Sequence, residues 1–357
     1  MRKYIIPVFL LTLVFLLALF AGNSAIRTSD ILAVLTGGGT ESQRMIVFQI
    51  RLPRIAAAAS AGAGLSVSGY LLQGSLDNRI ASPGILGINN GAGLFVLLSA
   101  CIFPYQTGMK CMMAFLGAFL VTLLVNFLAA ETGMTRSSVV LSGVAVSALC
   151  ASIIDIIISR KPETVADKAA FQIGGFSAVP AAAVSFAVPA ITACLVLAYL
   201  TAPSMDILCL GDETAAGLGL NVKKYRALCI FCSALLAGAS ISMGGLIGFV
   251  GLIVPNCVRG LNTGKSRTAL VNSILYGSLF LLLCDTLSRL VVFPYELPCG
   301  LFLSVAGAPF LILMLVKKRK RLGTDLLRSK RWKHHTGAER FFGQRRSALT
   351  GERSHPS

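Results

Sequence analysis

The sequence predicts an all-α integral membrane protein with about ten transmembrane helices. Of its 357 residues, 55% are hydrophobic and only 13% are charged, and the mean hydropathy is +0.77. A soluble domain would carry roughly a quarter charged residues. Apolar runs of about 20 residues recur along the chain, the length that a helix needs to cross a bilayer core of about 30 Å. We therefore expect lipid around most of the chain.

The apolar runs define ten spans, with ends that are uncertain by several residues. The spans are 4–22, 51–74, 84–104, 108–130, 136–159, 181–201, 225–244, 246–260, 268–293 and 296–316. The first run is longer than the apolar region of a usual signal peptide and further spans follow it, so we interpret it as a transmembrane helix. The eighth span is short and contains Pro255, so it is the one least suited to a full crossing.

The basic residues indicate the orientation. An even number of spans places both termini on one side, and a basic run, 317–321, directly follows the last span. Lys and Arg accumulate on the cytoplasmic side of membrane proteins. We therefore expect a multi-pass protein of the bacterial cell membrane with both termini in the cytoplasm. Residues 317–357 hold 13 Lys/Arg against three Asp/Glu, most of the net charge of +17. We expect a membrane domain over 1–320 and a disordered basic cytoplasmic tail over 321–357.

This distribution of charge favours membrane topology over nucleic-acid binding, because no nucleic-acid fold signal accompanies it.

With this orientation the cytoplasmic loops are 75–83, 131–135, 202–224 and 261–267. Loop 202–224 is the longest of them, and its polar residues have helical potential. Arg51 and Arg54 lie at the outer end of the second span, against the positive-inside rule. Such an exception requires a partner or a purpose.

Small residues are dense in two spans, 56–69 and 237–245. Small side chains let helix backbones approach closely, which favours a compact bundle. Ala61–Gly69 and Ala237–Gly245 share Ala, Gly, Ala, Ser and Gly at matching places, in spans that we expect to run in opposite directions. This weak match suggests an inverted repeat, as many transporters have.

The motifs of common enzyme classes are missing from the sequence. The three histidines, His334, His335 and His355, all lie in the tail, which excludes histidine-based triads and zinc proteases from the membrane region. The segment GLNTGKS at 260–266 resembles a phosphate-binding loop but lacks its glycine spacing. We therefore expect no catalytic residue, no metal and no cofactor, and any ATP that drives transport would be hydrolysed by another subunit.

Ionisable residues are scarce within the spans. Asp155 lies in the fifth span, and Asp285 and Arg289 are spaced i, i+4 in the ninth. Charges in lipid are costly, so these residues should face a partner or a cavity. For Asp285 and Arg289 a mutual ion pair is one interpretation. Cys229 and Cys232 form a C-x-x-C inside a span without a second pair, and we interpret them as small buried hydrophobes.

Three ordered segments carry a resemblance to a known family. They are RLPRIAAAASAGAGLSVSGYLLQGSLDNRIASPGILGINNGAG (51–93), LGDETAAGLGLNVKKYR (210–226) continuing to GGLIGFVGLIVPNCVRGL (244–261), and CDTLSRLVVFPYELPCGLFLSVAGAPFLILML (284–315). In this order and spacing the chain resembles the FecCD-type permeases, the membrane subunits of ATP-binding cassette (ABC) importers for iron-siderophore, haem and cobalamin. It departs from the family's usual N-P-L-A-x-P at 78–83 and from the family's P-H at Pro255-Asn256.

The resemblance implies roles for two sets of residues. Arg51, Arg54 and Arg289 match outward arginines that pair with glutamates of an extracytoplasmic solute-binding protein; the alternative is interfacial anchoring. Residues 211–219 match a cytoplasmic coupling helix that docks into the ATPase subunit; the alternative is a solvated loop. The coupling residues are Gly211, Asp212, Glu213, Ala215, Leu218 and Gly219, with the two acidic residues in the first turn.

The resemblance also implies the assembly: two permeases, as a homodimer or with a paralogous partner, two cytoplasmic ABC ATPases, a solute-binding protein and membrane lipid, without nucleic acid. The implied fold is the bundle of a type II ABC importer permease, which alternates between outward and inward access. Two alternatives stay open. An ion-coupled secondary transporter would need a coupling-ion site, for which only Asp155 is a candidate, and a membrane enzyme would need a nucleophile or metal set.

Overall fold

The computed structural model describes residues 2–20, 28–103, 106–177, 179–261, 264–291 and 295–309. The chain divides into a unit of residues Met1–Val305 and a second unit, Ala306–Ser357, of which only 306–309 are described. The predicted basic tail over 321–357, and the last residues of the tenth predicted span, lie outside the described residues.

The described residues form helices and connecting turns, without a strand among them. The α-helices are α1 Arg2–Phe20, α2 Thr28–Leu35, α3 Glu41–Met45, α4 Leu52–Ser75, α5 Ile88–Ile102, α6 Thr107–Glu131, α7 Arg136–Arg160, α8 Val165–Ile173, α9 Ala181–Leu208, α10 Asp212–Gly217, α11 Val222–Gly244, α12 Val250–Leu261 and α13 Ser266–Leu290. A last apolar helix covers Cys299–Pro309. Short helices of other types are η1 Ile46–Arg51 (a π-helix), η2 Pro83–Leu86 and η3 Pro162–Thr164.

Each of the ten predicted spans coincides with an apolar helix, so the predicted fold class is confirmed. Among the described residues, six helices are long and apolar enough to cross a membrane; they are Glu41–Ser75, Thr107–Glu131, Arg136–Arg160, Ala181–Leu208, Val222–Gly244 and Ser266–Leu290. The other four apolar helices are shorter. One of them is α12, which corresponds to the short eighth span and contains Pro255.

Two helices extend well beyond their predicted spans. The second span was predicted to begin at residue 51, but α3, η1 and α4 form one helical stretch from Glu41 to Ser75. Thr40 begins it with a capping box, in which its hydroxyl and the side chain of Gln43 each accept a backbone hydrogen bond from the other residue. The span 181–201 was predicted to end before Pro203, but α9 runs through this proline to Leu208. The polar loop that contains α10 is therefore shorter than 202–224.

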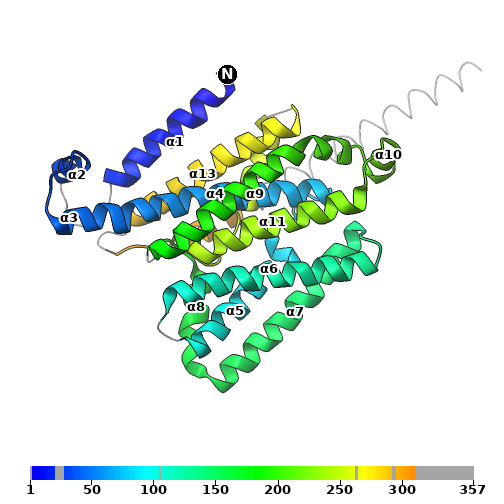
Figure 1. Cartoon of the computed structure of the whole chain (residues 1–357), viewed down its shortest axis with the longest axis horizontal. Helices are drawn as coiled ribbons and strands as arrows, with labels where there is room; N and C mark the ends of the chain where they lie inside the picture. The colour runs from blue at the N-terminus through cyan, green and yellow to red at the C-terminus, as the bar shows by residue number, and fades with distance from the viewer. Residues whose placement is uncertain are drawn as a thin grey trace, which may run out of the picture. The chain divides into compact units, whose positions relative to one another are not determined.

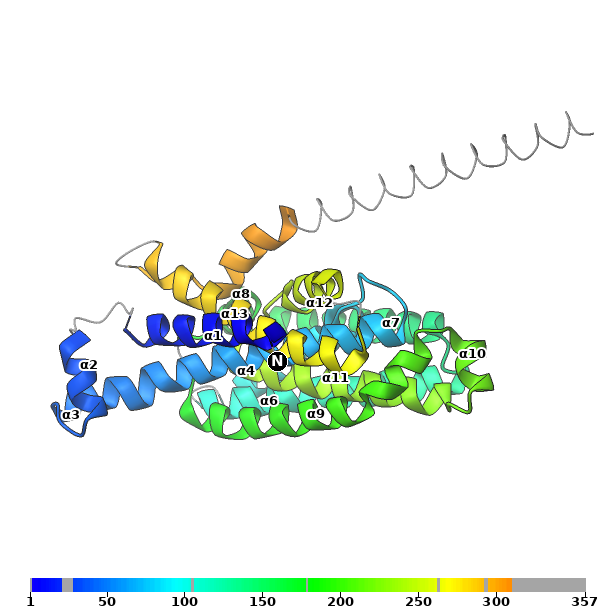
Figure 2. The same ribbon diagram turned by 90° about the horizontal axis from the view of Figure 1, so that it is seen from above.

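The centre of the first unit is formed by α4 and α11, which lie side by side in Figures 1 and 2. The hydroxyl of Ser68 bonds with that of Ser233 at 2.7 Å, and Ser240 donates to the carbonyl oxygen of Ala61 at 3.4 Å, so the two helices run antiparallel. These are the spans that the hypothesis of an inverted repeat compares; the hypothesis itself stays untested.

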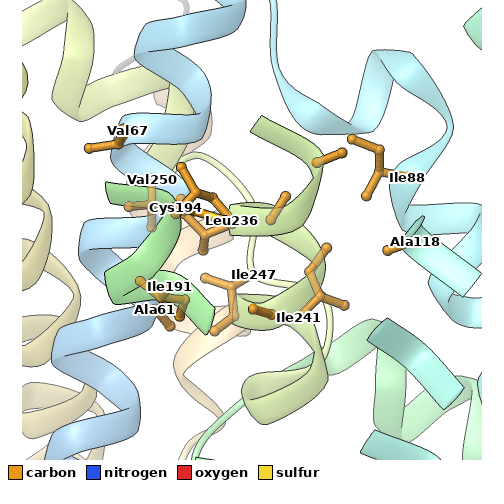
Figure 3. Packing of buried hydrophobic residues seen from close by; sticks show 14 of the residues in the cluster. Ala61, Val67, Ile88, Ala118, Ile191, Cys194, Leu236, Ile241, Ile247 and Val250 are labelled. Carbon is orange, nitrogen blue, oxygen red and sulfur yellow. The ribbon is translucent and has the colours of Figure 1, made fainter. Parts of the chain in front are cut away.

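Small residues make this centre compact, as the sequence indicated. A Cβ on Gly69 of α4 would overlap the carbonyl oxygen of Gly251 in α12, and a Cβ on Gly62 would overlap that of Gly277 in α13. Figure 3 shows side chains of the buried cluster from α4, α9 and α11, among them Ala61, Ile191 and Leu236. By contrast, α6, α7 and α9 keep large apolar side chains exposed on their outer faces, as expected of helices that face lipid.

The first unit has two ends that matter for function. One end carries α2, α3 and the start of α4, and we name it the α3 end (left in Figure 1). The opposite end carries α10 and the end of α4, and we name it the α10 end (right in Figure 1). The two sets of predicted site residues lie at these opposite ends.

Candidate functional sites at the two ends of the bundle

The three predicted docking arginines come together at the α3 end. Arg51 ends η1, Arg54 lies in the first turn of α4, and Arg289 lies in the last turn of α13. The three side chains are buried, with exposed fractions of 4%, 8% and 4%. We name these arginines, with Asp285 and Glu296, the arginine cluster.

Two of these arginines bind the end of α1. Arg51 Nη1 donates to the carbonyl oxygen of Leu19 at 2.6 Å, and Arg289 Nη1 donates to that of Ala18 at 3.4 Å. The last carbonyls of a helix have no partner within the helix, and the helix dipole makes this end negative. The arginines therefore satisfy α1 while α1 shields part of their charge.

The third arginine bridges two carboxylates. Arg54 Nε and Nη2 donate to the carboxylate of Asp285 at 3.0–3.3 Å, and Nη1 donates to Glu296 Oε2 at 2.7 Å. Asp285, which is fully buried, also forms an ion pair of 3.2 Å with Arg289. The i, i+4 pair considered from the sequence is thus present, but Asp285 is shared between α4 and α13.

Glu296 is the member of the arginine cluster that sequence reasoning missed. Its side chain is 29% exposed, so it is the most accessible group bound to Arg54. Glu296 lies within segment 284–315, which carries the resemblance, but the resemblance assigned it no role. The cluster carries one more positive than negative side chain, which is the property that the docking hypothesis requires. The docking role itself stays a prediction.

At the α10 end, the predicted coupling segment forms a short helix. Gly211 precedes α10 with φ +101°, Asp212 and Glu213 lie in its first turn, and Leu218 caps its end. Gly219 follows with φ +87°, a conformation that favours glycine. The segment expected from the sequence, 211–219, agrees with α10 and the residues that flank it. Its function as a coupling helix is a separate prediction.

Only one of the six residues of α10, Ala215, is buried. Glu213 and Leu218 are exposed, and Leu218 shows 61% of its surface. Leu210, just before the helix, is 60% exposed. Two exposed leucines beside an acidic side chain can pack into a cleft of another protein while the carboxylate pairs with a basic residue there.

A network of ion pairs holds the start of α10. Asp212 accepts hydrogen bonds from Arg226 Nη2 at 2.7 and 2.9 Å and from Arg136 Nη2 at 3.1 Å. Arg136 Nη1 also donates to Asp77 Oδ2 at 2.8 Å. Burial alone would raise the pKa of Asp212, but the two guanidinium groups outweigh it and lower the pKa below its usual value. Sequence reasoning did not single out Arg136, Arg226 or Asp77.

Asp155, the candidate for a coupling-ion site, has a basic neighbour. Its carboxylate lies 3.4 Å from Lys168 Nζ of α8, and its side chain is 74% exposed. An ion pair with lysine already balances this charge, so the arrangement gives a coupling cation little to bind.

Comparison with known proteins gives a family match over most of the chain. A family model described as the FecCD transport family matches residues 10–317. The Fe(3+)-citrate import system permease protein YfmE of Bacillus subtilis is 35% identical over 293 residues, which cover 81% of this chain and 88% of that protein. The iron(3+)-hydroxamate import system permease protein FhuG of the same organism is 34% identical over 317 residues, covering 86% of this chain and 94% of that protein.

The hemin transport system permease protein HmuU of Yersinia pestis is 30% identical over 319 residues, covering 88% of this chain and 96% of that protein. Among solved structures, a metal-chelate type ABC transporter in an inward-facing conformation superposes with a TM-score of 0.77. It is 24% identical and covers 89% of this chain and all of that chain. At this identity the likeness supports the fold.

Proposed function

The chain belongs to the FecCD transport family, and we propose that it is the membrane-spanning permease subunit of an ABC importer for an iron chelate, such as a siderophore or haem, or for the related chelate cobalamin. The observation that carries this proposal is the family match over residues 10–317. Relatives of 30–35% identity are permeases of import systems for Fe(3+)-citrate, iron(3+)-hydroxamate and hemin. The bundle of apolar helices fits a protein of the cell membrane.

In this proposal the chain carries no ATPase activity of its own, and two cytoplasmic ABC ATPases supply the energy. The glycine spacing at 260–266 does not fit a phosphate-binding loop. Exposed Glu213 of α10 and exposed Leu218, which caps its end, support docking of the ATPase at the α10 end. The α10 end therefore faces the cytoplasm, and both termini lie there, in agreement with the basic run 317–321.

We further propose that the α3 end faces outward and receives a solute-binding protein. The excess of positive charge in the arginine cluster supports this, because guanidinium groups bind carboxylates with two parallel hydrogen bonds. Since Arg51, Arg54 and Arg289 have partners within the chain, docking would exchange one carboxylate for another. Glu296 is the partner most easily exchanged, because it is the most exposed.

In this proposal the permease acts as one of a pair, either two copies or two paralogues. Residues 1–320 form its membrane domain, and residues 321–357 add a basic cytoplasmic tail. Each access state of the pair would be favoured by one arrangement of the ATPases, transmitted through α10. Charged catalytic groups are not needed for this function, because the permease changes shape and breaks no covalent bond.

An ion-coupled carrier is the alternative function. It would need a site for the coupling ion, whereas Asp155 already pairs with Lys168. Reconstitution separates the two functions. Proteoliposomes that contain the permease, its ATPase and the binding protein should accumulate ferric citrate, a ferric hydroxamate or haemin only when ATP is present on the ATPase side. Accumulation driven by a proton or sodium gradient, without ATPase, would refute the importer.

A further inference from the structure

Arg226 is the most deeply buried charged side chain at the α10 end. It lies in the second turn of α11 and is 2% exposed. A guanidinium group removed from water needs a partner for each of its donors, because an unsatisfied buried charge is costly. The hydrogen-bond partners of Arg226 therefore show which parts of the chain this side chain connects.

Those partners come from three other elements. Arg226 Nε donates to the carbonyl oxygen of Ser75, the last residue of α4, at 3.1 Å. Nη1 donates at 2.8 Å to the carbonyl oxygen of Met134, in the turn between α6 and α7, where Met134 has φ +56°. Nη2 binds both carboxylate oxygens of Asp212, the first residue of α10. One planar group thus joins the end of α4, the α6–α7 turn and α10 to α11.

Arg136 adds a second connection to the same carboxylate. It lies at the start of α7 and binds Asp212 and Asp77, and Asp77 follows the end of α4. Asp212 therefore receives two arginines from different helices. Its lowered pKa keeps the carboxylate ionised, so the contribution of these pairs is lost only in acid, as the pH falls below the usual value of 3.8.

Few other contacts attach α10 to the rest of the first unit. Ala215 is its only buried residue, and the side chains that face outward are available to another protein. A force applied to the exposed face of α10 would therefore reach the membrane helices chiefly through Asp212 and through the chain on either side.

We propose that Arg226 is a positioning residue that clamps α10 to the bundle, so that α10, the end of α4 and the α6–α7 turn move as one body when the ATPase moves α10. This inference rests on the proposed function, because it assumes an ATPase at α10. Lysine cannot replace the arginine, since one ammonium group lacks the fixed fork that reaches three directions at once.

The first test compares two arginine-to-lysine variants in the reconstituted permease–ATPase complex. Arg226→Lys should lower the amount of chelate transported per ATP hydrolysed by about tenfold, within the usual range of coupling effects. Arg259→Lys is the matched control. Arg259 is a partly buried arginine of α12 that contacts Tyr70 and not α10. The chelate is whichever of ferric citrate, a ferric hydroxamate or haemin the wild-type complex transports.

The outcomes are distinct. Wild-type coupling in the Arg226→Lys complex would overturn the inference, and so would an equal loss in the Arg259→Lys complex. If the wild-type complex transports no chelate with ATP, the proposed function fails instead.

A second test needs no variant of Arg226 and so does not depend on its folding. Spin labels are introduced at Thr214 of α10 and at Glu131 at the end of α6, both exposed, as noncanonical amino acids because the chain has ten cysteines. The distance between the labels should stay the same with and without ATP bound to the complex, while the distance from Thr214 to a label on the ATPase reports that the complex responds. A changed Thr214–Glu131 distance would overturn the clamp.

Discussion

Arg54 and Asp285, which are 231 positions apart in the sequence, form a buried ion pair in which two nitrogens of the guanidinium group reach the carboxylate at 3.0–3.3 Å. The pair joins the first turn of α4 to the last part of α13. Arg289 binds the same carboxylate from within α13. The charges at the α3 end are therefore organised around one aspartate that is fully buried.

The first prediction concerns the stability of this pair. Asp285→Ala leaves two buried arginines without their shared carboxylate, so we expect a loss of about 3–5 kcal/mol in stability. The thermal unfolding temperature of the purified protein in detergent is the measurement. Asp155→Ala is the control, because it breaks a largely exposed pair and should cost at most about 1 kcal/mol. Equal shifts in both variants would contradict the prediction.

The second prediction concerns docking of the binding protein. Reversing Arg51 and Arg54 to Glu would disturb buried contacts as well as docking, so it cannot separate the two effects. Glu296→Gln removes the carboxylate charge that competes for Arg54, and it keeps a side chain of nearly the same shape at position 296. If the arginines bind carboxylates of the binding protein, its affinity for the permease–ATPase complex should increase several-fold at low salt, and the increase should shrink at high salt. Unchanged affinity would argue that the arginines act only within the chain.

The third prediction concerns the crossing of α4 with α12. Gly69→Ala places a Cβ on the carbonyl oxygen of Gly251, and backbone cannot yield as a flexible side chain does. We expect a loss of about 1–3 kcal/mol or more, measured as a lower thermal unfolding temperature. Gly108→Ala is the control, because a Cβ there meets nothing within 4 Å. A Gly69→Ala protein as stable as the control would show that the helices are farther apart.

The fourth prediction concerns the exposed face of α10. Glu213→Arg reverses a charge that faces outward, so the bundle should remain folded while transport by the complex falls at least about tenfold. Lys223→Glu, an exposed reversal at the start of α11, should change transport little. Replacing Gly219 with a larger residue is less informative, because its φ of +87° strains any other side chain. Normal uptake by the Glu213→Arg complex would remove α10 from the ATPase interface.

The sequence by itself determined the fold class and the approximate positions of the apolar helices, and the family resemblance located the short helix at 212–217. These features depend on composition and on neighbours a few positions apart, which the sequence displays directly. The sequence also showed that Arg51 and Arg54 needed a partner, because charge at the outer end of a span is an exception to the usual topology. It placed Asp285 and Arg289 on one face of a helix by their spacing.

Only the tertiary structure decided which groups satisfy these charges. Arg54 bonds to Asp285 and Glu296, and Arg226 bonds to Asp212 and to the carbonyl oxygens of Ser75 and Met134. Apart from Asp212, which is 14 positions from Arg226, these partners lie far away in the sequence, and no local periodicity relates them. The continuation of α9 through Pro203 was likewise decided by packing, because Ala202, Met205 and Leu208 are buried there. Helix propensity is a weak preference that contacts with neighbouring helices override.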